Sequence, residues 1–199
     1  MEEKDGKPAM AEKSNGTDDV HAVRNILAAA RFASEKHAGQ KRKGARQEPY
    51  INHLIEVAAL AAQGIEALDS ALLMAAFLHD TIEDTGVSRE ELAERFGEEV
   101  ALLVDEVTDD KRLPQEVRRA LQVEHAPALS PRAQTLKLAD KISNLRGILS
   151  SPPVNWDFQR KREYFEWARR VVDGLRQPNP ALKAEFERVF AEFPPARQP

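Results

Sequence analysis

Apolar residues recur at helical spacing along most of this chain, and no stretch shows the strict alternation of a half-buried strand. The periodicity predicts helices over residues 20–37, 50–62 and 68–82. Residues 71–78, within the third of these, are apolar throughout, and a helix that is apolar on all sides is buried. The pattern therefore predicts an all-α fold organised around this segment.

Further helices are predicted downstream, where proline, glycine and polar turns divide the chain, over residues 88–97, 98–107, 114–124, 130–149, 156–175 and 181–193. Two of these helices have clear start signals. Ser88 forms a capping box with Glu91, and Ser130 precedes a proline, Pro131, at the first helical position.

The ends of the chain differ in composition from the rest. Residues 1–19 are charged and poor in apolar side chains, which predicts a disordered leader. Residues 20–193 are expected to form one domain with a sizeable core, and residues 194–199 are expected to form a flexible tail.

Composition narrows the possible functions. The chain has 29 Lys and Arg against 33 Asp and Glu, a formal net charge of −4, which argues against nucleic-acid binding through global basic charge. It has no cysteine, which excludes disulfides and thiolate metal sites. Neither a signal peptide nor an apolar run of membrane length is found, so we expect a soluble cytoplasmic protein without a membrane partner. The sequence leaves both a monomer and a homodimer open.

Four side chains from three separate predicted helices are candidate metal ligands: His53, His79, Asp80 and Asp140. Both histidines lie on the apolar stripe of their helix and point inward. A single inward histidine is more often a core residue, so the hypothesis rests on the whole set. The adjacent His-Asp pair can reach one ion only near a helix end, because neighbouring side chains diverge by ~100°. Nitrogen and oxygen donors suit Mn²⁺, Fe²⁺ or Zn²⁺.

Glu83 and Asp84 follow the His-Asp pair by one helical turn and are a candidate acid/base pair. A bound divalent metal lowers the pKa of its water toward neutrality, and one carboxylate could orient or deprotonate that water while the other protonates the leaving oxygen. The alternative is that both only cap or solvate a helix end. Residues 39–49 carry four cations, which indicates either a solvated loop or a clamp for an anionic substrate.

Several motifs, in order along residues 22–190, resemble the HD-superfamily hydrolase domain of the RelA/SpoT alarmone enzymes: YINH (50–53), AFLHDTIEDT (76–85), FG (96–97), KLADK (137–141) and NLR (144–146). Three others are similar to the stand-alone small alarmone hydrolases of the metazoan SpoT-homologue type: VTDDK (107–111), LQVE (121–124) and EYFEWA (163–168). The resemblance implies a single-domain helical HD-type fold of a metal-dependent phosphohydrolase, which removes the 3′-pyrophosphate of (p)ppGpp to give GDP or GTP.

The resemblance also implies roles for particular residues. It implies one Mn²⁺ per chain, held by His53, His79, Asp80 and Asp140, beside the catalytic pair Glu83 and Asp84. The implied contacts to the nucleotide substrate are Arg42, Lys43, Lys111, Asn144, Arg160 and Tyr164. The other histidines are His21, His37 and His125, and we expect them to be structural or surface residues.

Alternative functions remain open at this point. One is a phosphatase for NADPH at its 2′ position, or for another nucleotide with a phosphate on the ribose. NADPH would then be a substrate and not a redox cofactor, because the chain lacks a Rossmann fingerprint. A different class is a nucleotide sensor or a partner-binding helical domain without catalysis. The chain is too short for an added synthetase domain, so we expect hydrolysis without synthesis.

Overall fold

Helices form the regular structure of residues 15–194, the part of the chain that this computed structural model describes. They follow in the order α1 (Asn15–Lys36), α2 (Ile51–Gln63), α3 (Ser70–Leu78), α4 (Thr81–Thr85), α5 (Arg89–Phe96), α6 (Glu98–Val107), α7 (Gln115–His125), the 3₁₀ helix η1 (Ala126–Ala128), α8 (Pro131–Ser150), α9 (Phe158–Gly174) and α10 (Pro180–Ala191). The described residues contain no β-strand beyond two isolated bridges, and the all-α prediction is confirmed.

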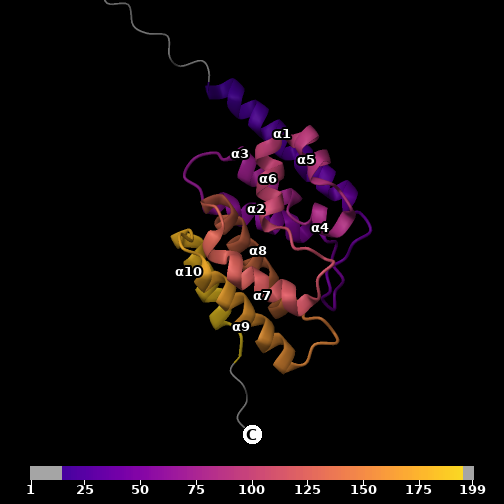
Figure 1. The fold of residues 1–199 in the computed structure, drawn as a ribbon, viewed down its shortest axis with the longest axis vertical. Helices are drawn as coiled ribbons and strands as arrows, with labels where there is room; N and C mark the ends of the chain where they lie inside the picture. Colours follow the sequence, from indigo (N-terminus) through magenta and orange to yellow (C-terminus); the bar gives the residue numbers. More distant parts are fainter. Residues whose placement is uncertain (1–14, 195–199) are drawn as a thin grey trace, which may run out of the picture.

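Helix α3 lies at the centre of one half of the molecule, where it packs against α1, α2 and α6 (Figure 1). Its residues are mostly Ala, Leu and Met, which favour a helix and carry no polar group that needs solvent. The Asp69 side chain caps its first turn by accepting a hydrogen bond from the Leu72 amide at 3.0 Å. The segment predicted to be buried on all sides is therefore a core helix.

The predicted continuous helix over residues 68–82 was wrong at one point. Helix α3 ends at Leu78 and α4 begins at Thr81, so His79 and Asp80 form the junction. Two side chains take carbonyls that would otherwise continue the helix: His79 Nδ1 bonds the Ala76 carbonyl at 2.9 Å, and the Thr81 hydroxyl donates to the Leu78 carbonyl at 2.6 Å. Because the helix is broken here, the side chains of His79 and Asp80 need not diverge as neighbours on a continuous helix do, and both can point to the same place.

Helix α8 runs between the two halves of the molecule and contacts α2, α6, α9 and α10 (Figure 1). Ser130 caps it as predicted, since its hydroxyl accepts from the Ala133 amide at 3.3 Å. The apolar stripe predicted for this helix is buried, with Leu138, Ile142 and Leu145 fully enclosed. This stripe fixes the rotation of α8, so its polar side, with Asp140, faces α2 and the α3–α4 junction.

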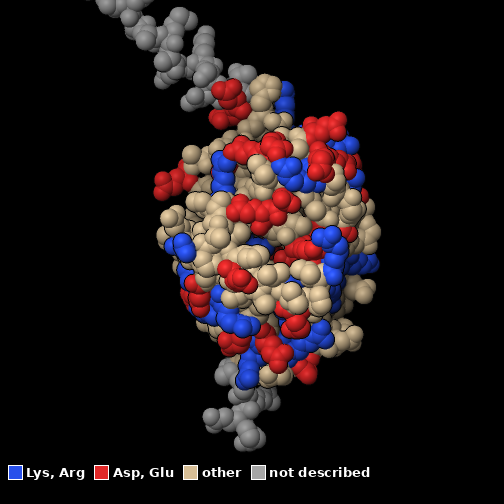
Figure 2. Space-filling view, viewed as in Figure 1, with Lys and Arg blue, Asp and Glu red and all other residues tan. Residues whose placement is uncertain are grey.

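The chain ends fall partly outside the described residues. Helix α1 begins at Asn15, ahead of the predicted start at Val20, while residues 1–14 of the predicted leader and residues 195–199 of the predicted tail are not described. On the face shown in Figure 2, acidic and basic side chains are interspersed, in keeping with a formal net charge of −4. Within the described part of the chain, no helix combines the length and the apolar character needed to cross a membrane.

Candidate active site

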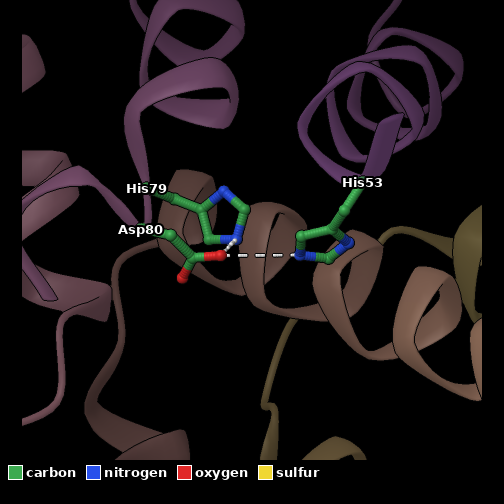
Figure 3. Close-up of side chains that lie close together, drawn as sticks. All are labelled: His53, His79 and Asp80. Atoms are coloured by element: carbon green, nitrogen blue, oxygen red, sulfur yellow. Dashed lines mark ion pairs between the residues drawn. The ribbon is translucent and has the colours of Figure 1, made fainter. Parts of the chain in front are cut away.

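Side chains from α2 and from the α3–α4 junction meet in a small buried cluster. His53, His79 and Asp80 each offer a ligand atom, and these atoms lie within 4.8 Å of one another. Asp80 Oδ2 is 3.0 Å from His79 Nε2 and 3.6 Å from His53 Nε2, so one carboxylate oxygen faces both imidazoles (Figure 3).

Asp140 reaches the same cluster from α8. Its Oδ1 atom is 3.3 Å from His53 Nε2 and 3.8 Å from His79 Nε2. Its other oxygen accepts from the buried Lys141 ammonium at 3.1 Å. The four predicted ligands, separated by up to 87 positions in the sequence between His53 and Asp140, are therefore brought together, with Asp140 close to both imidazoles.

The cluster fits a divalent cation. His79 Nε2 is buried and has no hydrogen-bond partner among the described residues, while its Nδ1 atom is held by the Ala76 carbonyl. An unpartnered imidazole nitrogen between two carboxylates is available to coordinate a metal ion. A sulfur-free set of two nitrogens and two oxygens suits Mn²⁺, Fe²⁺ or Zn²⁺.

The electrostatics of the cluster point the same way. Burial lowers the pKa of His79, but Asp80 and Asp140 outweigh it and raise that pKa from 6.5 to about 10. Burial raises the pKa of both aspartates, but His79 beside Asp80 and Lys141 beside Asp140 hold these pKa values well below the usual range. The site thus strongly favours two carboxylates together with positive charge.

A chain of polar contacts holds His53 from behind. Its Nδ1 atom is 2.8 Å from the Ser143 hydroxyl, which donates to Glu56 Oε2 at 2.6 Å. Since Ser143 uses its hydrogen on Glu56, it must accept the Nδ1 hydrogen of His53, which leaves the Nε2 lone pair directed at the cluster. Arg146 donates to Glu56 Oε1 at 3.0 Å and completes the support. Such partners of a metal-binding histidine fix its tautomer and orientation.

We expect Ser143→Ala to weaken Mn²⁺ binding by roughly 10- to 100-fold, because it removes the acceptor that sets the His53 tautomer. Calorimetric titration of the metal-free protein with MnCl₂ measures this. Ser150→Ala is the matched control, since Ser150 is exposed at the end of the same helix. Equal Mn²⁺ affinity in Ser143→Ala and wild type would contradict this role.

Tyr50 belongs to the candidate site, although the sequence did not single it out. Its hydroxyl donates to Asp80 Oδ2 at 2.6 Å, the same oxygen that faces the imidazoles. Burial and the Asp80 charge raise the pKa of Tyr50, so the phenol keeps the hydrogen that it donates. The available signal was its position one helical turn before His53, on the same face.

The predicted acid/base pair lies on α4 beside the cluster. Arg118 donates to Glu83 Oε1 at 3.2 Å. Asp84 is held on both oxygens, because Gln40 Nε2 donates to Oδ2 at 2.6 Å and the Lys111 ammonium contacts Oδ1. Burial, with the charges of Asp80, Asp109 and Asp84, raises the pKa of Glu83 from 4.5 to about 7. Glu83 can therefore hold or release a proton near neutrality.

A cleft of about 430 Å³ opens in front of these carboxylates. Its lining includes most of the predicted substrate contacts: Arg42, Lys43, Lys111, Asn144 and Tyr164. The predicted contact Arg160 does not line the cleft. Its guanidinium lies 5.0 Å from the ring centroid of Trp156, and Trp156 does line the cleft. Its role in substrate binding stays a prediction. The lining also includes cations that the sequence analysis did not single out, namely Arg118 and Arg119.

Glycines shape the basic loop that forms one wall of the cleft. Any side chain at Gly44 would collide with the carbonyl of Ser151, so the loop can lie directly on the segment after α8. A side chain at Gly147 would collide with the Arg42 guanidinium. This space lets Arg42 lie across α8, where it donates to the Ser143 carbonyl and to Asn144 Oδ1, each at 3.4 Å.

This chain is similar to known proteins in sequence and in fold. The HD domain family matches residues 29–164. The guanosine-3′,5′-bis(diphosphate) 3′-pyrophosphohydrolase MESH1 of Xenopus tropicalis is 47% identical over 84% of this chain and 93% of its own length, and the Homo sapiens protein of that name is 46% identical with the same coverage. A solved structure described as a metazoan ortholog of SpoT that hydrolyzes ppGpp has a TM-score of 0.81 and 40% identity, over 84% of this chain and 94% of that chain.

The helical fold and the His-Asp cluster are those of a metal-binding hydrolase domain, and the chain belongs to the HD domain family. Within that family its similarity is to the MESH1 proteins of animals, over most of both chains. The family resemblance inferred from the motifs is thereby confirmed.

Proposed function

We propose that this protein is an enzyme that removes the 3′-pyrophosphate of guanosine tetra- and pentaphosphate, giving GDP or GTP and pyrophosphate, with one Mn²⁺ per chain. The observation that carries the proposal is the meeting of His53, His79, Asp80 and Asp140 beside two carboxylates at a cation-lined cleft. The names of the relatives and the ortholog described as hydrolyzing ppGpp support the choice of substrate.

The residues of the chain divide the work as follows. Held by His53, His79, Asp80 and Asp140, a divalent ion would supply a Lewis acid and lower the pKa of water. Asp84 orients the attacking water and accepts its proton. Glu83, whose pKa is about 7, donates a proton to the 3′-oxygen of the ribose as its bond to phosphorus breaks. Asp84 takes one proton from water and Glu83 gives one to the 3′-oxygen. The pair therefore holds the same number of protons after the reaction as before, now on Asp84 instead of Glu83.

The cations of the cleft would neutralise the substrate. A bis(diphosphate) carries several negative charges, and Arg42, Lys43, Lys111, Arg118 and Arg119 all line the cleft. Planar guanidinium groups bind phosphate oxygens in pairs, while ammonium groups act as point charges. Asn144 and Tyr164 line the cleft on the α8 and α9 sides, where they would meet the sugar.

The test is the release of pyrophosphate from ppGpp by purified protein loaded with Mn²⁺, compared with Fe²⁺ and Zn²⁺. A parallel assay measures phosphate release from NADPH, the alternative substrate, and kcat/KM for the two decides between them. We expect turnover of ppGpp with Mn²⁺. Binding of ppGpp without any turnover in each metal would overturn the proposal in favour of a nucleotide sensor, and a higher kcat/KM for NADPH would replace ppGpp as the substrate.

A further inference from the structure

His37, expected from the sequence to be a structural or surface residue, is linked to the proposed catalytic pair through one side chain. It lies directly after α1 and is only 2% exposed. Its Nδ1 atom is 2.6 Å from Gln40 Oε1, and Gln40 Nε2 donates to Asp84 Oδ2 at 2.6 Å. A buried imidazole is thereby connected, through the Gln40 amide, to Asp84, 47 positions away.

The direction of these hydrogen bonds follows from the groups involved. An ionised carboxylate only accepts hydrogen bonds, so Gln40 must turn its NH₂ toward Asp84. Its carbonyl oxygen then faces His37, which satisfies it only with a hydrogen on Nδ1. His37 therefore holds the amide in the orientation that Asp84 requires, a choice that the shape of a glutamine does not determine.

The His37 ring is itself held in place. It stacks on Tyr50 with the ring centroids 5.2 Å apart and an angle of 22° between the planes. Tyr50 donates to the ligand Asp80, as described above. One stacked pair of rings thus supports both acidic groups, Asp80 directly and Asp84 through Gln40.

The second partner of Asp84 is less suited to hold it during the reaction. The Lys111 side chain is 48% exposed and lines the cleft. An anionic substrate would attract this ammonium away from Asp84, because a phosphate carries more charge than a carboxylate. Gln40 lines the cleft as well, but a neutral amide is attracted to phosphate far less than an ammonium, so it would remain the fixed restraint on Asp84.

We propose that His37 and Gln40 are positioning residues, which keep the Asp84 carboxylate in one orientation toward the reacting water. The inference rests on the proposed function, because it assumes that Asp84 acts in the hydrolysis of ppGpp. It assigns to residues 36–40, the Lys-His-Ala-Gly-Gln segment that joins α1 to the basic loop, a part in the reaction through Asp84, without contact to the reacting atoms.

The test compares kcat and KM of Gln40→Leu and His37→Phe with wild type. Gln40→Leu removes the donor to Asp84, and we expect kcat to fall roughly 10- to 100-fold with KM within about twofold, since a misplaced catalytic group costs about this much. His37→Phe keeps the stacking on Tyr50 but loses the Nδ1 hydrogen, so we expect a smaller fall in kcat. Gln63→Leu, exposed at the end of α2, is the matched control and keeps wild-type kcat.

The possible results separate the two proposals. Wild-type protein that fails to turn over ppGpp overturns the proposed function. Active wild type with unchanged kcat in both variants overturns the positioning role alone. A raised KM with unchanged kcat would instead make Gln40 a substrate contact. Loss of the Mn²⁺-induced rise in Tm would show that the variant impairs metal binding. Either result also overturns the positioning role. A retained Mn²⁺ shift with lowered kcat supports it, and the same shift shows that the variant is folded.

Discussion

Asp80→Ala is expected to abolish both the Mn²⁺-induced stabilisation and the turnover of ppGpp. Its Oδ2 atom faces both imidazoles and accepts the Tyr50 hydroxyl, so the truncation removes a ligand and leaves a buried phenol without its acceptor. A metal ion contributes several kcal/mol to such reactions, and each 1.36 kcal/mol is tenfold, so we expect kcat to fall by roughly 10³-fold or more.

The measurement is thermal unfolding with and without MnCl₂, together with pyrophosphate release. A ligand at 100 times its Kd stabilises a protein by about 2.7 kcal/mol, and this gain should vanish in Asp80→Ala. Asp105→Ala, at an exposed position of α6, is the control and should behave as wild type. If Asp80→Ala kept the full Mn²⁺ shift and wild-type kcat, the assignment of the metal site would be wrong.

Glu83→Gln should lose activity and gain stability. The amide cannot donate or accept a proton in the reaction, so we expect kcat to fall about 10²- to 10⁴-fold while Mn²⁺ binding persists. The folded pKa of Glu83 is about 7, against 4.5 for the free group. Below the lower value both states hold the proton and no difference arises. As pH rises between these values, the unfolded chain ionises first and the folded protein loses stability.

This loss is complete once the pH exceeds the folded pKa. At pH 8 the metal-free Glu83→Gln protein should therefore exceed wild type by about 1 to 3 kcal/mol in free energy of unfolding, nearer the lower figure because the side chain is partly exposed. Near pH 4 the two should coincide. Urea unfolding after chelator treatment at both pH values measures this. A wild type that is the more stable at pH 8 would refute the raised pKa of Glu83.

The sequence predicted most of the helices well because most have an apolar face or a local start or stop signal. Helix α6 spans the predicted residues 98–107, and Ser88 and Ser130 cap their helices as expected. The α3–α4 break was not predicted, because it depends on side-chain bonds to the Ala76 and Leu78 carbonyls, which compete with helical bonds in a way that apolar periodicity does not register.

For the site, the sequence predicted the candidate ligands but not the residues that support them. His53, His79, Asp80 and Asp140 could be chosen because ligand residue types are few and the resemblance carried them. The residues that support the site could not be chosen from the sequence. Ser143, Glu56 and Gln40 have ordinary polar side chains, and their roles arise only when α2, α8 and the basic loop are brought together. Periodicity identifies the inward face of a helix, but it does not pair that face with the residues of another helix.

The enclosure of α3 has a consequence for how the cleft can open. The metal ligands of the α3–α4 junction are joined to a helix packed on α1, α2 and α6, and densely packed interiors deform little. Any opening of the cleft would therefore come from its outer lining, which includes the basic loop, Lys111 and α7. That loop is tied to the segment after α8 by the Ala45 amide on the Pro152 carbonyl, at 3.1 Å, and by the Arg46 amide on Ser151 Oγ, at 3.0 Å. An opening on this side would require the basic loop and the segment after α8 to shift together, while the α3–α4 junction stays in place.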